Sequence, residues 1–242
     1  MDSTVSDPAM VDYLRFHGPR FDYLLRLLSG RIQPGMRVLD IGWSQLTNRI
    51  HNALNVAVDA LGFDADGSIP SGRYYRLDLN DCQWPERCRD DLPMYDAIIF
   101  AEVMEHLHTS PRLVLQYLTS LLRPGGILIV QTPNAVALPR RVKMLLGWNP
   151  FELIRDDASN PGHFREYTAD ELCNYAVTVG LSVESIECRS YFDYRFARHG
   201  ATTLFVRGIG NIKNYVYPVL PASLRPGLTA ILRRSNLSRQ AA

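Results

Sequence analysis

Acidic residues follow short apolar runs in a pattern that could bind a ligand carrying both a charge and hydroxyl groups. The first run is Arg37–Ile41, in which Asp40 is followed two residues later by Gly42. A carboxylate at a strand end can hold a cationic amino group, and a glycine lets the backbone approach a ligand without an interfering Cβ atom. Turns use the same residue types, so this assignment depends on the strands that follow.

Two further acids extend the pattern. Asp64 follows the run Ala60–Phe63, and an acid at the tip of a second strand typically accepts hydrogen bonds from both hydroxyls of a ribose. Asp59 is the alternative if the strand is shifted, and Asp64 is preferred because Gly62 and Phe63 give the better strand end. Asp78 ends a third run, where it could accept from the exocyclic amine of a purine. The three acids together predict a nucleoside.

Histidine is the side chain whose charge changes near neutral pH, so His106 and His163 are the candidate catalytic bases. Each also has a structural interpretation, as a packing or surface-loop residue. His106 and His108 raise the question of a metal. Their spacing does not place them on one helix face, and no third ligand lies near them in the sequence, so no metal is expected.

Short β-branched runs alternate with segments of helical period, which predicts βα units around a mostly parallel sheet. The helical segments are Arg20–Leu28, which stops at Gly30, and Pro111–Leu122, which stops at a Pro-Gly-Gly turn. Thr168 and Glu171 form a capping box for a third helix. The predicted strands are 37–41, 60–63, 74–77, 97–101, 127–131, 182–188 and 228–232.

With this order of strands and acids, the sequence resembles the class I S-adenosylmethionine-dependent methyltransferases, especially their small-molecule branch. The likeness runs from about residue 37 to 180, and its most specific parts are Glu-Val-Met-Glu-His-Leu at 102–107 and Leu-Arg-Pro-Gly-Gly at 122–126. It implies a Rossmann-like α/β sheet of seven strands with helices on both faces and the last strand antiparallel. It also implies S-adenosylmethionine as cofactor, bound by Asp40, Gly42, Ser44, Asp64, Asp78, Leu79, Ala101 and Glu102.

The sequence departs from this family in the loop after the first strand. The family's loop usually reads Asp-x-Gly-x-Gly-x-Gly, and here the second and third glycines are Ser44 and Leu46. If Ser44 had to adopt a positive φ, the strain would be about 1 kcal/mol, enough to weaken cofactor binding about tenfold. We nevertheless expect the site to be retained.

Residues 134–164 belong to neither neighbouring unit and are predicted to form a lid over the site, because long connections after strands are often functional. A His-x-Arg-x-aromatic segment often follows the lid in similar methyltransferases and faces the active-site mouth. Arg165, Tyr167 and Asn134 are therefore assigned to the substrate. Arg165, and Arg140 with Arg141, could pair with a substrate carboxylate or phosphate, although solvated positions are the alternative.

The charge is unevenly placed. The chain has a formal net charge of +1, yet residues 194–242 contain eight Lys or Arg and no Asp or Glu. These charges form no dense cluster, so no nucleic acid is expected, and contact with a membrane surface is the less favoured interpretation. This basic segment is predicted to contain a helix at 201–217, whose apolar stripe Phe205, Ile209, Ile212 and Val216 packs on the sheet, and the final strand.

With 242 residues, of which 46% are apolar, the chain suits a single domain, 1–242, with N-terminal helices at 8–30, the lid insertion and the basic segment 194–242. No transmembrane run or export signal is visible, and four cysteines without metal-site spacing suggest reduced thiols, so a cytoplasmic location is expected. The oligomeric state cannot be read from the sequence.

The favoured function is methyl transfer from S-adenosylmethionine to an oxygen or nitrogen of a small molecule, such as a sugar, a lipid-linked glycan or a natural product. The missing glycines leave a second interpretation, a non-catalytic partner subunit with weakened cofactor binding. A dinucleotide-dependent oxidoreductase is disfavoured because Gly-x-Gly-x-x-Gly is absent after the first strand.

Overall fold

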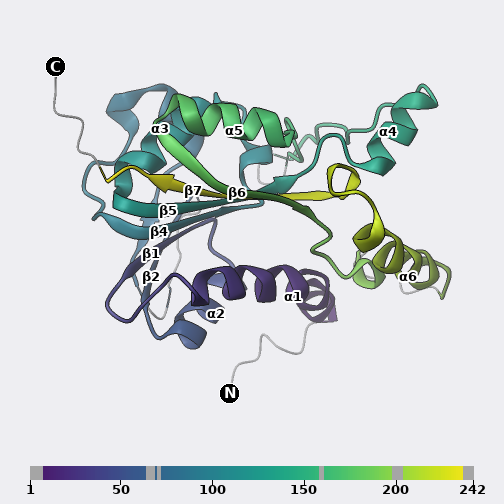
Figure 1. Ribbon diagram of the computed structural model, residues 1–242, viewed down its shortest axis with the longest axis horizontal. Helices are drawn as coiled ribbons and strands as arrows, with labels where there is room; N and C mark the ends of the chain where they lie inside the picture. The colour runs from purple at the N-terminus through teal and green to yellow at the C-terminus, as the bar shows by residue number, and fades with distance from the viewer. Residues whose placement is uncertain (1–7, 64–68, 70–71, 158–160, 198–203, 237–242) are drawn as a thin grey trace.

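The computed structural model describes residues 8–63, 69, 72–157, 161–197 and 204–236 (Figure 1). Seven strands in this part of the chain form one sheet in the order β3-β2-β1-β4-β5-β7-β6. The pairs from β3 to β5 are parallel, and β7 is antiparallel to both β5 and β6. The predicted seven-stranded sheet with an antiparallel last strand is confirmed.

Every predicted strand is present, and most are longer than predicted because ladder hydrogen bonds continue into polar residues that carry no apolar signal. The strands are β1 (Arg37–Ile41), β2 (Ala57–Gly62), β3 (Tyr74–Arg76), β4 (Tyr95–Ala101), β5 (Leu122–Pro133), β6 (Leu181–Arg189) and β7 (Gly227–Arg234).

The helices cover both faces of the sheet, with α1 and α2 on one side and α3 and α5 on the other (Figure 1). The bounds are α1 (Pro8–Ser29), α2 (Gln45–Leu54), α3 (Pro111–Leu121), α4 (Leu138–Leu145), α5 (Ala169–Thr178) and α6 (Leu204–Val219). Short 3₁₀ turns are η2 (Leu79–Gln83), η3 (Pro85–Arg87), η4 (Met104–His106), η5 (Tyr194–Phe196) and η6 (Ala222–Leu224). Among the described residues, the helices are all too short or too polar to cross a bilayer.

Alternating strand residues form the two halves of the core. Val38 and Ile99 pack toward the α1 and α2 side, with Phe21 of α1. Leu39 and Ile98 pack toward the other side, where α3 and α5 cover them. Both faces are buried because parallel strands connected by helices have cover on each side.

The predicted capping box of α5 is confirmed. The Thr168 hydroxyl accepts from the Glu171 amide at 3.2 Å, and the Thr168 amide donates to the Glu171 carboxylate at 2.9 Å. This arrangement satisfies two of the amide groups that a helix start leaves unpaired.

The apolar stripe of α6 does not pack on the sheet, so that prediction was wrong. Ile209, Ile212 and Val216 are 41%, 63% and 40% exposed, while the side chain of Phe205 and all of residues 201–203 lie outside the description. The main packing partner of α6 is η5, which α6 approaches closely at Gly210. The helical period shows only that one face is apolar, and it does not show what covers that face.

The segment 134–164 leaves the sheet after β5 and contains α4, which lies at the same end of the sheet as α6 (Figure 1). Several large apolar side chains in this segment are exposed, and its role as a lid stays a prediction. They are Val142, Met144, Leu145, Leu146, Trp148, Phe151, Leu153 and Ile154.

Two glycines of α6 provide a matched test of how this helix packs against η5. A Cβ atom at Gly210 would overlap the Tyr194 carbonyl oxygen and lie 2.6 Å from the Arg195 amide, whereas one at Gly208 meets nothing within 4 Å. We expect Gly210→Ala to lower the free energy of unfolding by about 1–3 kcal/mol. Gly208→Ala should be neutral or stabilising, by about 1 kcal/mol at most. Thermal denaturation measures both, and equal melting temperatures would contradict the close packing.

Candidate active site

Two adjoining cavities open at the carboxyl ends of β1, β2 and β4. The first cavity, of about 710 Å³, includes Arg20, Glu102, Glu105, His106 and His163 in its lining. The second cavity, of about 750 Å³, is lined mostly by apolar side chains. They share a wall made of Tyr13, Gly42, Trp43, Gly62, Phe63, Glu102, Val103 and His106. Each has the size of a small-molecule site, and the carboxyl edge of a parallel sheet is where such ligands bind.

The loop after β1 keeps the shape that a close ligand needs. Gly42 has φ of 79°, and a Cβ atom there would lie 3.1 Å from the Val103 side chain. Ser44 has φ of −155°, which any residue adopts, and its hydroxyl caps α2 by accepting from the Leu46 amide at 3.2 Å. Leu46 is buried in the core beside Ile50. The lost glycines therefore introduce no strain at Ser44 and no side chain from Leu46 into the cavities.

Asp40 lies beneath this loop and lines neither cavity. Its carboxylate is 2% exposed and accepts from the Thr47 hydroxyl at 2.6 Å, which ties β1 to α2. Burial raises the pKa of Asp40 to about 7, and the Thr47 hydrogen bond and the nearby Arg20 charge only partly offset that effect. A direct contact between Asp40 and a ligand's amino group stays a prediction.

Of the two acids considered for the ribose, Asp59 is already occupied. It accepts from the Tyr95 hydroxyl at 2.9 Å, from Arg37 at 3.0 Å and from the Arg73 amide at 2.8 Å. Asp64 lies outside the described residues, so its assignment to the ribose also stays a prediction. The strand end that leads to it, Gly62 and Phe63, lines both cavities.

Asp78 and Leu79 line the second cavity, where the sequence predicts the purine. The Asp78 carboxylate is exposed and accepts from the Asn80 amide at 2.9 Å, which starts η2. Apolar walls from Ile41, Leu61 and Leu77 line the same cavity, as a planar base requires.

Ala101 and Glu102 end β4 and line the first cavity. Glu102 has φ of 58°, a left-handed conformation that costs a non-glycine residue roughly 1 kcal/mol or more. Its amide donates to the Gln131 carbonyl at 2.7 Å, which places the side chain over the cavity wall. Its Oε1 has no hydrogen-bond partner in the described chain, and burial raises the pKa of this carboxyl.

The sequence analysis missed Arg20. This residue of α1 is 4% exposed, lines the first cavity, and has no hydrogen-bond partner for Nε or Nη1 within the described chain. Buried guanidinium groups are usually paired, so Arg20 is a candidate residue for holding an anionic group of a ligand. Nothing in the sequence distinguishes Arg20 from the other arginines, because its burial depends on α1 packing across the strand ends.

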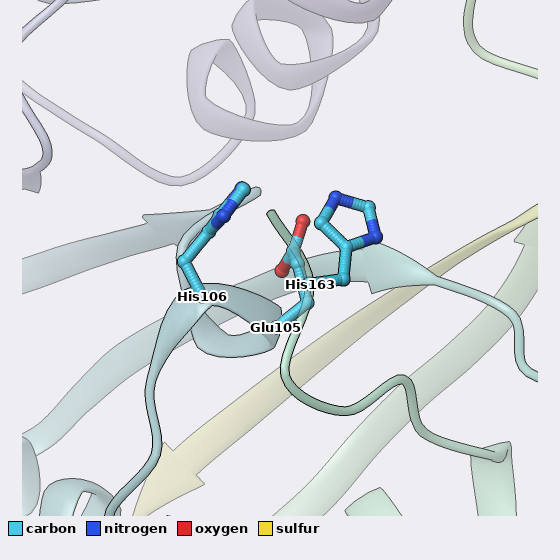
Figure 2. Close-up of side chains that lie close together, drawn as sticks. All are labelled: Glu105, His106 and His163. Carbon is cyan, nitrogen blue, oxygen red and sulfur yellow. The ribbon is translucent and has the colours of Figure 1, made fainter. Parts of the chain in front are cut away.

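His106 and His163 come together from separate segments. Their ring centroids lie 4.8 Å apart in an edge-to-face arrangement. His106 Nδ1 lies 2.9 Å from the Gly162 carbonyl oxygen, and His163 Nδ1 lies 2.9 Å from Glu166 Oε1. Burial lowers the pKa of His106, and the neighbouring His163 lowers it further. Glu105, to which the sequence analysis gave no role, is adjacent to both rings (Figure 2).

The three residues predicted to bind substrate line neither cavity. Arg165 pairs with Glu171 at 2.5 Å on the surface, and Tyr167 is buried in the core. The side-chain amide of Asn134 donates to the backbone carbonyl oxygens of Ser223 and Arg225, at 3.1 and 2.8 Å. These positions give each residue a structural contact, and substrate binding by them stays a prediction.

Among the arginines considered for the substrate, Arg140 is the one that lines the first cavity. It forms an ion pair with the buried Glu166 and donates to the Pro150 carbonyl oxygen at 3.0 Å. Arg141 instead donates to the Val136 carbonyl oxygen at 2.6 Å.

The sheet order, the antiparallel β7 and the cavities at the strand ends define a Rossmann-like fold of the class I methyltransferase type. A family model described as a methyltransferase domain matches residues 13–186. A relative from Mycolicibacterium smegmatis, described as a probable S-adenosylmethionine-dependent methyltransferase, is 31% identical over 133 residues. That match covers 54% of this chain and 46% of the relative. The chain belongs to the S-adenosylmethionine-dependent methyltransferase family.

Solved structures of low sequence identity share the fold. An S-adenosylmethionine-dependent methyltransferase from Mesorhizobium loti has a TM-score of 0.55 at 14% identity, covering 88% of this chain and 96% of that one. The cyclopropane synthase MmaA2 from Mycobacterium tuberculosis has a TM-score of 0.57 at 16% identity, with coverages of 88% and 84%. At these identities the likeness concerns the fold alone.

The buried Asp40 makes a prediction about pH. Its folded-state pKa of about 7 lies above the ordinary value near 4, so its stabilising contribution is complete below about pH 4 and is lost as the pH rises through 7. Asparagine can still accept from Thr47 and cannot ionise. We expect Asp40→Asn to gain stability relative to wild type between about pH 5 and pH 8, by up to a few kcal/mol.

Chemical denaturation at several pH values measures this difference. Asp22→Asn is the control, because Asp22 is an exposed acid on α1 that pairs with Arg49 at 3.3 Å. Parallel pH profiles for wild type and Asp40→Asn would show that Asp40 is not buried in this way.

Proposed function

We propose that this chain transfers a methyl group from S-adenosylmethionine to an oxygen or nitrogen of a small molecule, such as a sugar, a lipid-linked glycan or a natural product. The observation that carries the proposal is the pair of connected cavities. One has an apolar lining and ends at Asp78, and the other holds two histidines and unpaired buried charges. Family membership supports the same activity.

The described residues fit the cofactor. Gly42 leaves space beside the Val103 side chain that a Cβ atom would fill. Asp78 and Leu79 line the second cavity, which we assign to the purine. The amino-acid end of the cofactor carries an ammonium and a carboxylate. We assign the ammonium to Glu102 and the carboxylate to Arg20, since both residues line the first cavity and have polar atoms without hydrogen-bond partners in the described chain. When bound, the cofactor supplies an electrophilic methyl group on a sulfonium.

The acceptor then belongs in the first cavity, beside His106 and His163. A hydroxyl nucleophile must be oriented and must lose its proton, whereas a neutral amine requires orientation alone. The two rings face the same cavity as Glu102, so they can act on an acceptor held there. The segment 134–164 contributes Arg140 to the wall, and we propose that it selects the acceptor.

The non-catalytic alternative was motivated by the missing glycines, and the extended φ of Ser44 removes that reason. For the compartment, the four cysteines are free thiols, which supports the cytoplasm as the proposed location.

Arg20 provides a selective test of cofactor binding. Arg20→Met should weaken S-adenosylhomocysteine binding at least about tenfold, because charge-assisted hydrogen bonds to a carboxylate contribute roughly 1.5–3 kcal/mol. The same variant should bind methylthioadenosine, which lacks the amino-acid end, as wild type does. Arg26→Met, on the exposed face of α1, is the control. Calorimetry gives the affinities, and equal weakening of both ligands would indicate a general loss of structure instead.

The activity itself is tested by supplying S-adenosylmethionine with fractionated small-molecule extracts and measuring S-adenosylhomocysteine together with the methylated product. We expect product with wild type and a lower turnover, at least about tenfold, with His163→Gln, whose S-adenosylhomocysteine affinity should be unchanged. If wild-type protein gave no calorimetric heat with S-adenosylhomocysteine at about millimolar concentration, the partner-subunit role would replace this proposal.

A further inference from the structure

Glu105, His106 and His163 form a cluster of metal-ligand type. One ligand atom from each lies within 4.8 Å of the others, and Figure 2 shows the three side chains directed to the same side of the ribbon. Glu105 and His106 belong to η4, and His163 follows α4, so the fold brings them together from two segments. All three line the first cavity, and His106 lines the second as well.

The carboxylate of the cluster is incompletely paired. Glu105 is 0% exposed; its Oε2 accepts from the Thr132 hydroxyl at 3.0 Å, while Oε1 has no hydrogen-bond partner in the described chain. Glu102, which lines the same cavity, also has an Oε1 atom without a hydrogen-bond partner among the described residues. A buried carboxylate oxygen without a donor is costly unless a cation or a further donor occupies the adjacent space.

The histidines are oriented as metal ligands usually are. His106 Nδ1 lies 2.9 Å from the Gly162 carbonyl oxygen, which can only accept, so this nitrogen carries the proton. His163 Nδ1 faces Glu166 Oε1 at 2.9 Å, and Arg140 holds Glu166 in place. In both rings Nε2 is then left as the lone-pair donor. A carbonyl or carboxylate on the far nitrogen is the outer-shell feature typical of histidines that bind metals.

We propose that Glu105, His106 and His163 bind a divalent cation at the junction of the two cavities, where Glu102 supplies a further carboxylate in the cavity lining. One oxygen and two imidazole nitrogens suit Mn²⁺, Fe²⁺, Co²⁺ or Zn²⁺ better than the all-oxygen preference of Ca²⁺. Three protein ligands leave open positions for water and for a ligand from the cavity.

This inference rests on the proposed function and narrows it to an oxygen acceptor. When bound, the cation would help an acceptor hydroxyl to lose its proton to water. The oxygen would then form a bond to the methyl carbon as the carbon–sulfur bond breaks and S-adenosylhomocysteine leaves. The histidines then act on the acceptor through the cation. The sequence predicted no metal because no third ligand was identified close to His106 and His108 along the chain. The structure places His108 against Phe164 instead, with ring centroids 5.6 Å apart, and brings in His163 and Glu105.

The test is a titration of chelator-treated, full-length protein with Mn²⁺. Electron paramagnetic resonance measures the concentration of free Mn²⁺ at each step. We expect one site in wild type and an affinity at least about tenfold lower in Glu105→Gln and His163→Gln. Glu166→Gln, which changes the partner that orients His163 and also removes the ion pair with Arg140, should weaken binding by about 10- to 100-fold. His108→Gln is the matched control and should bind Mn²⁺ as wild type does.

Two additional measurements keep the result interpretable. Co²⁺ bound to wild type should give visible d–d absorption bands, a readout that needs no variant to fold. S-adenosylhomocysteine binding, measured on the same samples, separates the two proposals. Absence of binding by Mn²⁺, Co²⁺ and Zn²⁺, or equal binding by wild type and both ligand variants, overturns the metal site. If S-adenosylhomocysteine still binds in that case, the proposed function stands.

Discussion

The site depends on two hydrogen bonds that tie the turn after β4 to the segment after α4. The Phe164 amide donates to the Glu105 carbonyl oxygen at 2.8 Å, and the His106 ring bonds to the Gly162 carbonyl oxygen at 2.9 Å. Neither segment is a long regular element at this contact, so these bonds fix where His163 lies relative to Glu105. The same two hydrogen bonds also pair backbone groups of these segments. The pairing of the backbone and the placement of His163 therefore depend on the same contacts.

The buried and half-buried carboxylates among the described residues differ in how far they are paired. Asp59 accepts from three donors, and Asp40 accepts from Thr47. Within the described residues, Glu102 and Glu105 each have one carboxylate oxygen without a hydrogen-bond partner, and both side chains line the first cavity. An unpaired buried carboxylate oxygen is costly, so a cation or hydrogen-bond donor in the first cavity would stabilise Glu102 and Glu105.

The fold could be predicted because strand periodicity, proline and glycine stops, and the Thr168 capping box are local signals. The prediction that the apolar stripe at Ile209 packs on the sheet was wrong. Helical periodicity shows that a helix has an apolar face, but it does not show what covers that face. In the site, the β1 loop could be located, but the conformation of Ser44 follows from its hydrogen bonds as a helix cap. Arg20 and Glu105 needed the tertiary structure, since only burial and the absence of partners distinguish them.

An ion pair and a hydrogen bond connect α4 to the two histidines. Arg140 of α4 pairs with Glu166, Glu166 bonds to His163, and His163 meets His106 at the junction of the cavities. Glu166 is buried, so its position depends on the charge that Arg140 brings from the segment 134–164. The proposed cation site therefore depends on the Arg140–Glu166 ion pair for the orientation of the His163 ring.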